Sequence, residues 1–480
     1  MNAPRPDSPA SEARPDRPVN ADRPDAPAGD RRPVAVLLGE RGSLSAAEIA
    51  TAADPELPVL FLTDAAAEGG DSALLRQIAE ALAPTVRVDF ADLDACTEAV
   101  RAFGARTVAT FVDRLCPLAA ALRGRLGQGQ PADAGWGHKD AQRRTLTEAG
   151  VSRLRSATVP DAAGLRATAA DWGLPLVVKP VNGVASADTW LLNTPAELDT
   201  LLHDPAALTG AAMFVEEYLA GAPGPYPHLA DYVSVEVFRN PHAAGSGQLA
   251  FVTDRPPLAQ PCRETGLFAP SALAPAALDA VTACAVAALD ALGARHGVFH
   301  VEAKPGRTRP DVIEVNGRLG GFVARAVRYG TGLDLGRLAL ETAAGHPAAL
   351  PERLDWQRCV ASLLFQPPPA AHTITRAPGR RELARLPGVL AVDQLSVAGT
   401  EVAWRRGTSG AAATLWLAAD DHAELGRRFT EAATFLGTAF EFRDRHGRLV
   451  ADPDWLDALT AEPRPTGRHP HPERTQPHDS

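Results

Sequence analysis

Acidic, amide and basic side chains gather in one stretch of the sequence, residues 297–321. Two runs rich in Val, Phe and Ile, 298–304 and 311–318, flank a Pro/Gly/Arg turn and predict a β-hairpin. Because side chains alternate between the faces of a strand, Glu302, Glu314 and Asn316 are expected on one face. Carboxylate and amide oxygens, together with substrate phosphates, are the ligands that Mg²⁺ takes in proteins. The hairpin therefore predicts a site for Mg²⁺, or for Mn²⁺, beside a phosphate.

Three more polar residues are expected on the same face: His300, Lys304 and Arg318. Arg318 would lie beside the phosphoryl group, and His300 would contact an amine or accept its proton. A buried histidine with satisfied hydrogen bonds is an equal alternative for His300. The opposite face is expected to be apolar, with Phe299, Val301, Ile313 and Val315. A merely solvated polar face is the alternative for the hairpin, and the second carboxylate twelve residues before Glu314 argues against it.

Lysine is rare in this chain. Of 48 basic residues only Lys139, Lys179 and Lys304 are lysines, which leaves 45 arginines. A compact ammonium acts as a point charge on phosphate, and the planar guanidinium does not replace it well. Lys139 opens an expected helix, and Lys179 ends an apolar strand before a loop of small residues whose N–H groups can hold anionic oxygens. The three lysines are therefore expected to meet at a phosphate site, with chance under an arginine bias as the alternative.

The elements that must position these residues alternate in type. Apolar runs at 33–39, 58–63, 85–90 and 107–112 are separated by helical stretches such as 72–83, which predicts a parallel sheet with helical crossovers. Residues 213–219 read as a strand that leads into a hinge, and residues 275–293 as a packing helix. From about residue 356 onward the pattern predicts a smaller α/β unit.

Composition limits the function classes. A chain of 480 residues suggests two to four structural units. The formal charge of −10 argues against nucleic acid as the main partner, because no basic stripe is available for phosphates. The sequence contains neither a signal-type apolar segment nor an apolar run of membrane length. Five scattered cysteines show no zinc or disulfide spacing. We expect a cytoplasmic enzyme without a membrane partner.

The spacing of Glu302, Glu314, Asn316 and Arg318, followed by Leu-Gly-Gly at 319–321, resembles the metal-binding hairpin of the ATP-grasp superfamily. More narrowly, it is similar to the carboxylate–amine ligases that include the L-amino-acid (dipeptide) ligases. The resemblance covers roughly residues 33–450. It implies an α/β ATP-grasp fold with an N-terminal parallel-sheet α/β domain (33–135), a nucleotide-grasping central domain (136–350) with a lid at about 147–217, and a small C-terminal α/β subdomain (351–450). Residues 1–32 are expected to be a disordered, Pro-rich tail, and residues 451–480 a mostly disordered one.

The resemblance also implies roles for single residues. The nucleotide would be bound by Lys139, Lys179, Ser186, Glu216, Leu219 and Asp231, with Glu216 at the adenine amine and Asp231 at the ribose. The acid substrate or acyl phosphate would be bound by Arg318, Gly320, Gly321, Arg325 and Arg328. Lys179, His300 and Arg318 would be catalytic. Arg325 and Arg328 could equally be surface arginines. The loop after Lys179 departs from the family pattern, because Asp188 would repel a triphosphate unless a metal intervenes.

The activity that the resemblance implies uses ATP with Mg²⁺ or Mn²⁺. A small-molecule carboxylate, with an α-amino acid as first choice, would form an acyl phosphate and ADP, and an amine would then displace phosphate to form an amide. A homodimer is compatible with this expectation. Two alternatives stay open: a biotin-carboxylase-like enzyme that activates bicarbonate, and a nucleotide-binding regulatory protein without turnover.

Overall fold

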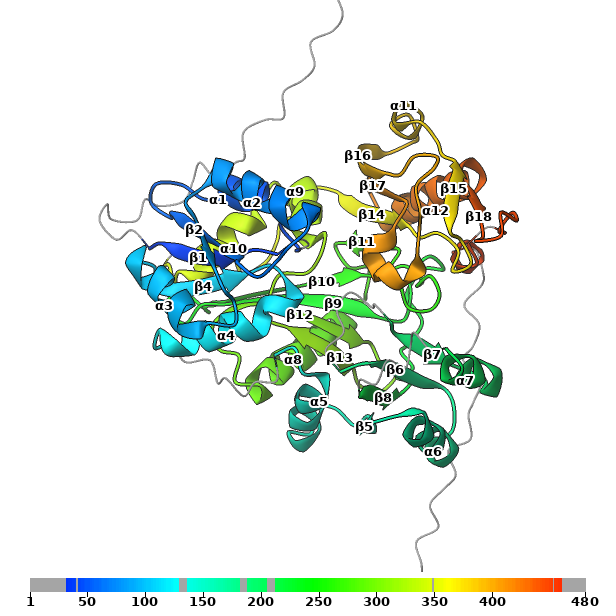
Figure 1. Ribbon diagram of the computed structural model, residues 1–480, viewed down its shortest axis with the longest axis horizontal. Coiled ribbons are helices and arrows are strands. Elements are labelled where there is room, and N and C mark those ends of the chain that lie inside the picture. Colours follow the sequence, from blue (N-terminus) through cyan, green and yellow to red (C-terminus); the bar gives the residue numbers. More distant parts are fainter. Residues whose placement is uncertain are drawn as a thin grey trace, which may run out of the picture.

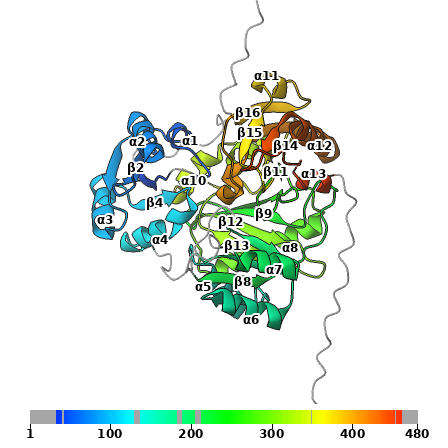
Figure 2. The same cartoon turned by 45° about the vertical axis from the view of Figure 1, so that its right-hand side comes forward.

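The computed structural model of the protein describes residues 32–39, 42–128, 136–181, 188–204, 212–347, 349–451 and 453–459. The expected N-terminal tail lies outside these ranges apart from Arg32, and Ser186 also lies outside them. Of the expected C-terminal tail, residues 451 and 453–459 are described, and Trp455 and Leu459 are buried in the core of the C-terminal part. Figures 1 and 2 show an N-terminal sheet in blue, a long central sheet in green to yellow, a small sheet at the bottom and a C-terminal α/β part in orange. Within the described ranges no helix has the length and apolar character needed to cross a membrane.

The N-terminal domain is a parallel sheet, as the apolar runs predicted. Its strands are β1 (Val34–Leu37), β2 (Val59–Asp64), β3 (Thr85–Val88) and β4 (Thr107–Thr110), in the order β3-β2-β1-β4. The helices between and after them are α1 (Ala46–Ala52), α2 (Gly70–Leu82), α3 (Leu93–Ala102) and α4 (Cys116–Arg125). Helical crossovers cover both faces of such a sheet and leave its carboxyl edge open to ligands. The segments after β1 and β4 at this edge carry Ser43 and Asp113.

The central sheet has eight antiparallel strands in the order β13-β12-β9-β10-β11-β14-β17-β16. Its first half contains β9 (Val233–Arg239), β10 (Gln248–Asp254), β11 (Gly266–Ala269), β12 (Gly297–Lys304) and β13 (Asp311–Asn316). Helix α8 (Pro275–Ala291) covers one face through Val281, Ala285 and Leu289, which are fully buried. Valines at alternate positions of β9 supply the matching apolar face.

The C-terminal part extends this same sheet. Strand β14 (Cys359–Phe365) pairs with β11, and β17 (Ala413–Ala419) and β16 (Val389–Leu395) follow. The domain boundary expected at residue 350 therefore runs through a continuous sheet. Helix α12 (His422–Ala439) packs on β14 and β17, beside the short pair β15 (Thr373–Arg376) and β18 (Glu441–Arg443). The connecting segments include α9 (Val323–Thr331), α10 (Leu335–Ala343), α11 (Arg380–Leu383), the 3₁₀ segment η2 (Trp404–Gly410) and α13 (Trp455–Ala458).

A separate four-stranded sheet lies within the range expected for the lid. It consists of β5 (Ser156–Val159), β6 (Leu176–Pro180), β7 (Trp190–Leu192) and β8 (Met213–Glu217), in the order β5-β8-β6-β7. Helices α6 (Ala162–Trp172) and α7 (Pro195–Leu202) pack on it around Leu165, Val178 and Val215. We call this sheet with its two helices the lid subdomain. Helix α5 (Lys139–Glu148) precedes it.

Candidate active site

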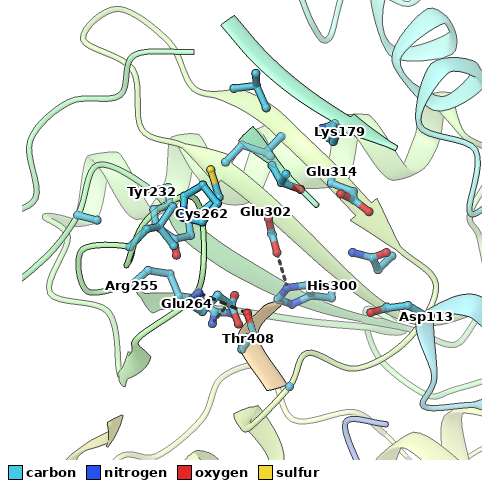
Figure 3. A pocket seen from close by; sticks show the side chains of 18 of the residues that line it. Asp113, Lys179, Tyr232, Arg255, Cys262, Glu264, His300, Glu302, Glu314 and Thr408 are labelled. Carbon is cyan, nitrogen blue, oxygen red and sulfur yellow. Dashed lines mark hydrogen bonds and ion pairs between the residues drawn. The ribbon is translucent and has the colours of Figure 1, made fainter. Parts of the chain in front are cut away.

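One cavity of about 830 Å³ lies where these parts meet. Its walls come from the N-terminal segments around Ser43 and Asp113, from lid strands β6 and β7, from the β12–β13 hairpin and from η2. Figure 3 shows the hairpin side chains Glu302, His300 and Glu314 in this cavity together with Asp113, Lys179 and Thr408. The volume is in the range of small-molecule sites that occur between domains.

The β12–β13 hairpin places the predicted metal ligands together. Glu302 pairs directly with Glu314 across the two strands, and His300 pairs with Asn316. All four residues line the cavity. A β-bulge after Glu302 inserts one extra residue in β13. Such a bulge shifts the alternation of side chains, and Ile313 therefore lines the cavity instead of the apolar face on which period two had placed it. Val315 lies in the core as expected.

The oxygen atoms of this hairpin fit a divalent cation. The side chains of Glu302 and Glu314 are 27% and 24% exposed, so their carboxylates face the cavity rather than the core. Burial opposes the charge of Glu302, but His300, Arg255 and Arg318 outweigh it and lower its pKa to about 2. One oxygen of Glu314 already accepts a hydrogen bond from the Lys139 ammonium at 2.6 Å. Two carboxylates and an amide that line one cavity are a suitable set for Mg²⁺ or Mn²⁺.

His300 is buried between two carboxylates. Its Nδ1 lies 2.5 Å from Glu236 Oε1, and its Nε2 lies 3.5 Å from Glu302 Oε1. Burial disfavours the charged ring, but Glu236 and Glu302 overcome this effect and raise the pKa of His300 to about 9. This setting favours the imidazolium form of the ring, which is paired with both carboxylates and is not a base. Of the two expectations for His300, the geometry fits the buried histidine with satisfied hydrogen bonds.

The two glycines after the hairpin differ in their surroundings, and only Gly320 contacts Glu236 and His300. Gly320 N–H donates to Glu236 Oε2 at 2.9 Å, and a Cβ at Gly320 would collide with Glu236 and His300. The adjacent Gly321 lines the cavity, and a Cβ there would meet no heavy atom of the described residues within 4 Å. The family resemblance implied that both glycines bind substrate, and this stays a prediction. Gly320 allows a close approach of the backbone to the buried Glu236.

All three lysines line the cavity, as their selective retention suggested. Lys179 lies 2.6 Å from Glu216, whose other oxygen accepts from Arg143 Nε at 2.6 Å. Burial opposes ionisation of Glu216, but Lys179 and Arg143 lower its pKa. Lys304 donates to both oxygens of Asp231 at 2.9 Å. Each ammonium is thus held in place by a carboxylate before any ligand arrives.

The residues predicted for the nucleotide lie on one wall of the cavity, apart from Ser186, which is outside the described residues. Glu216, Leu219 and Asp231 line it between the lid and the central sheet. Both oxygens of Glu216 are committed to Lys179 and Arg143, and Asp231 also accepts from Gly221 N–H at 2.9 Å. Their contacts with adenine and ribose stay predictions.

The predicted substrate arginines separate into two groups. Arg318 lines the cavity and its Nε donates to Asp113. Burial opposes the charge of Asp113, but Arg318 lowers its pKa. Arg325 and Arg328 are not among the described residues that line the cavity. Arg325 binds Glu48 of α1 and Asp393 of β16, and Arg328 is exposed. Of the two expectations for these arginines, Arg328 fits a surface arginine, and Arg325 lies at the junction of two domains.

Sequence reasoning missed a second polar group in the cavity. Arg255 is 2% exposed, donates to Ser234 Oγ and pairs with Glu264 at 3.1 Å. Tyr232 and Thr408 lie in the same part of the cavity (Figure 3). Single Arg and Glu residues carry no signal in a chain with 45 arginines. The one local signal for this polar group is in β9, where Ser234, the partner of Arg255, and Glu236 alternate with valines.

Two curated relatives match parts of the chain. Carnosine synthase 1 of Gallus gallus is 35% identical over 148 residues, which are 30% of this chain and 14% of that protein. Alanine–anticapsin ligase of Bacillus subtilis (strain 168) is 28% identical over 272 residues, which are 52% of this chain and 57% of that protein. The chain thus spans between about a seventh and somewhat more than half of their length. No protein-family model matches the sequence.

Among solved structures, the fold is similar to that of the L-amino acid ligase from Bacillus licheniformis. The TM-score is 0.65 at 19% sequence identity, and the match covers 87% of this chain and all of that chain. An identity this low shows a common fold and nothing finer. With the parallel N-terminal sheet, the lid subdomain and the antiparallel sheet that bears the carboxylate hairpin, the chain has the ATP-grasp fold.

Proposed function

We propose that the protein is an ADP-forming ligase that uses ATP to join a carboxylate, with an α-amino acid as first choice, to an amine. The observation that carries the proposal is the meeting of Lys139, Lys179 and Lys304 with the paired Glu302 and Glu314 in one cavity. The names of two similar proteins, an alanine–anticapsin ligase and an L-amino acid ligase, support the same substrate class.

The divalent ion would be held by Glu302, Glu314 and the Asn316 carbonyl. When bound, Mg²⁺ or Mn²⁺ would supply positive charge to the phosphate oxygens of ATP. The chain's own cations act in the same place, because Lys139 and Lys179 approach the cavity from α5 and β6. Their ion pairs with Glu314 and Glu216 fix them beforehand, so little reorganisation is needed when phosphate charge develops.

In the first step a carboxylate oxygen of the acid attacks the γ-phosphorus of ATP. A new O–P bond forms, the bond between the γ-phosphorus and the β,γ-bridging oxygen breaks, and its electron pair leaves with ADP. Arg318, held by Asp113, lies at the cavity wall where it can bind carboxylate or phosphoryl oxygens. Positioning and electrostatic stabilisation are the main contributions of a protein to phosphoryl transfer.

In the second step the nitrogen of the amine attacks the carbonyl carbon of the acyl phosphate. The C–N bond forms, the C–O bond to phosphate breaks, and one proton leaves the nitrogen. Inorganic phosphate departs with the electron pair and can take up that proton. His300 is not assigned as the base here, because both its nitrogens have carboxylate partners.

The test is a phosphate-release screen of the full-length protein with Mg²⁺, ATP and all pairs of the common amino acids. ADP release that requires both an amino acid and an amine, with an amide product detected by mass spectrometry, supports the proposal. Release that requires bicarbonate instead would assign the carboxylase alternative. ATP binding without hydrolysis under any pairing would leave the regulatory alternative.

The Glu314→Ala variant is a second test, with a control variant on the neighbouring helix. Without this carboxylate the cavity loses one oxygen ligand and the partner that fixes Lys139, so we expect ADP formation to fall by at least about 10²–10³-fold. Circular dichroism should be unchanged, because the side chain is partly exposed and Lys139 can be solvated. The control is Glu148→Ala, an exposed carboxylate at the end of α5. Turnover of Glu314→Ala at the level of this control would refute the assignment.

A further inference from the structure

The segment η2 (Trp404–Gly410) contacts the lid subdomain across the cavity from the C-terminal part. Arg405 Nη1 lies 2.7 Å from Asp188 Oδ1, and Nη2 forms a second ion pair with Asp204. The Trp404 ring meets Trp190 edge-on, with centroids 5.3 Å apart, and Arg405 stacks on Trp404 at 4.5 Å. One side chain of the C-terminal part is thus bound by two carboxylates of the lid.

The lid residues in this contact lie next to the wall of the proposed nucleotide site. Asp188 and Trp190 flank Thr189, which lines the cavity, and Trp190 begins β7. Strand β7 pairs with β6 through Trp190 and Val178, and the next residue of β6 is Lys179. Asp204 lies just beyond α7 on the same subdomain. Asp188 and Trp190 are therefore connected through β7 to the strand that carries Lys179.

The other end of η2 forms the opposite wall. Thr408 lines the cavity and accepts a hydrogen bond from Glu264 N–H at 3.3 Å. The Gln366 amide donates to the carbonyl oxygens of both Thr408 and Glu264, at 3.0 and 2.8 Å. Gly407 has a φ of +60°, which lets the chain turn between the two ends. Thus η2 is anchored beside Glu264 while Arg405 reaches the lid.

The charge of Arg405 offsets the negative charge of Asp188. From the sequence, Asp188 was expected to repel a triphosphate bound near Lys179. The guanidinium at 2.7 Å offsets this carboxylate. The attraction of Arg405 for two lid carboxylates exists only when the lid lies against the C-terminal part, so the contact favours the closed arrangement.

We propose that Arg405 is a positioning residue that latches the lid subdomain to the C-terminal part, so that the nucleotide wall and the opposite wall of the cavity close as one unit. The catalytic consequence rests on the proposed ligase function. A closed cavity keeps water away from the acyl phosphate. A protein without the latch would bind ATP more weakly and lose part of the acyl phosphate to hydrolysis, so that more ADP than amide is formed.

The experiment compares Arg405→Ala, Arg405→Lys and Asp204→Asn in the full-length protein, with Arg406→Ala, an exposed neighbour in the same segment, as the control. For Arg405→Ala we expect the dissociation constant of a non-hydrolysable ATP analogue, measured by calorimetry, to rise about tenfold, equivalent to about 1.4 kcal/mol. The KM for ATP should rise with it while kcat changes less. Arg405→Lys should restore part of the loss, and Arg406→Ala should match the wild type.

Two further readouts separate positioning from general destabilisation. The double variant Arg405→Ala, Asp204→Asn should be no worse than Arg405→Ala alone, since both changes remove the same contact. Binding of the ATP analogue should change the tryptophan fluorescence of the wild type, and this change should be smaller in Trp404→Phe. Equal analogue affinity in Arg405→Ala and Arg406→Ala overturns the proposal, and so does full additivity of the double variant. Analogue binding that depends on Arg405 without amide formation from any pair would refute the ligase function and leave the latch standing.

Discussion

The buried pair of Glu236 and His300 predicts a titration that can be measured directly. Glu236 is completely buried and His300 is 2% exposed. Burial alone would lower the pKa of the ring, but Glu236 at 2.5 Å and Glu302 raise it from 6.5 to about 9. The perturbation is Glu236→Gln, which keeps the shape of the side chain and removes its charge.

The sign and size of the effect follow from linkage. Because the pKa of His300 is higher in the folded protein than in the unfolded chain, the pair contributes stability that is fully present below about pH 6.5. That stability is lost as the pH rises through about 9. The rise of the His300 pKa from 6.5 to about 9 corresponds to roughly 3 kcal/mol. In Glu236→Gln most of this contribution should be absent, and the ring should be neutral at pH 8.

The assay is NMR of ¹³C-labelled histidine side chains in metal-free protein with a chelator, since a bound cation would repel the imidazolium. His300→Gln assigns the signal among the 13 histidines. We expect an apparent pKa near 9 in the wild type and below 7 in Glu236→Gln. Chemical denaturation between pH 6 and 9 gives the free energy of unfolding, with the exposed His446→Gln as control. An apparent pKa of His300 below 7 in the wild type, or one that Glu236→Gln leaves unchanged, would show that the reasoning is wrong.

Two further predictions use neighbouring residues as controls. Gly320→Ala should lower the free energy of unfolding by about 1–3 kcal/mol, because its Cβ would collide with Glu236 and His300, whereas Gly321→Ala meets no atom of the described chain within 4 Å and should be neutral in thermal unfolding. Equal melting temperatures for the two variants would contradict this account. Arg325→Ala should lower stability by about 1 kcal/mol, because its ion pairs with Glu48 and Asp393 are partly exposed, and Arg328→Ala should stay within about 0.5 kcal/mol of the wild type in urea denaturation. A larger loss in Arg328→Ala than in Arg325→Ala would exclude the assigned contacts.

The sequence by itself determined the features that depend on local patterns. Strand alternation placed Glu302, Glu314 and Asn316 on one face, because the period of two belongs to any β-strand. Alternating apolar runs predicted the parallel N-terminal sheet. The retention of three lysines among 45 arginines pointed to one site, because the chemical difference between the two cations does not depend on the fold.

Only the tertiary structure decided which segments from distant parts of the chain meet. A bulge turned Ile313 into the cavity, and strand pairing between β11 and β14 joined the expected C-terminal unit to the central sheet. Arg255 lines the cavity whereas Arg325 lies at a domain junction, although both are arginines near apolar elements. Spacing along one element fixes the relative directions of its own side chains. It does not fix which other element covers them, because that is set by packing over the whole chain.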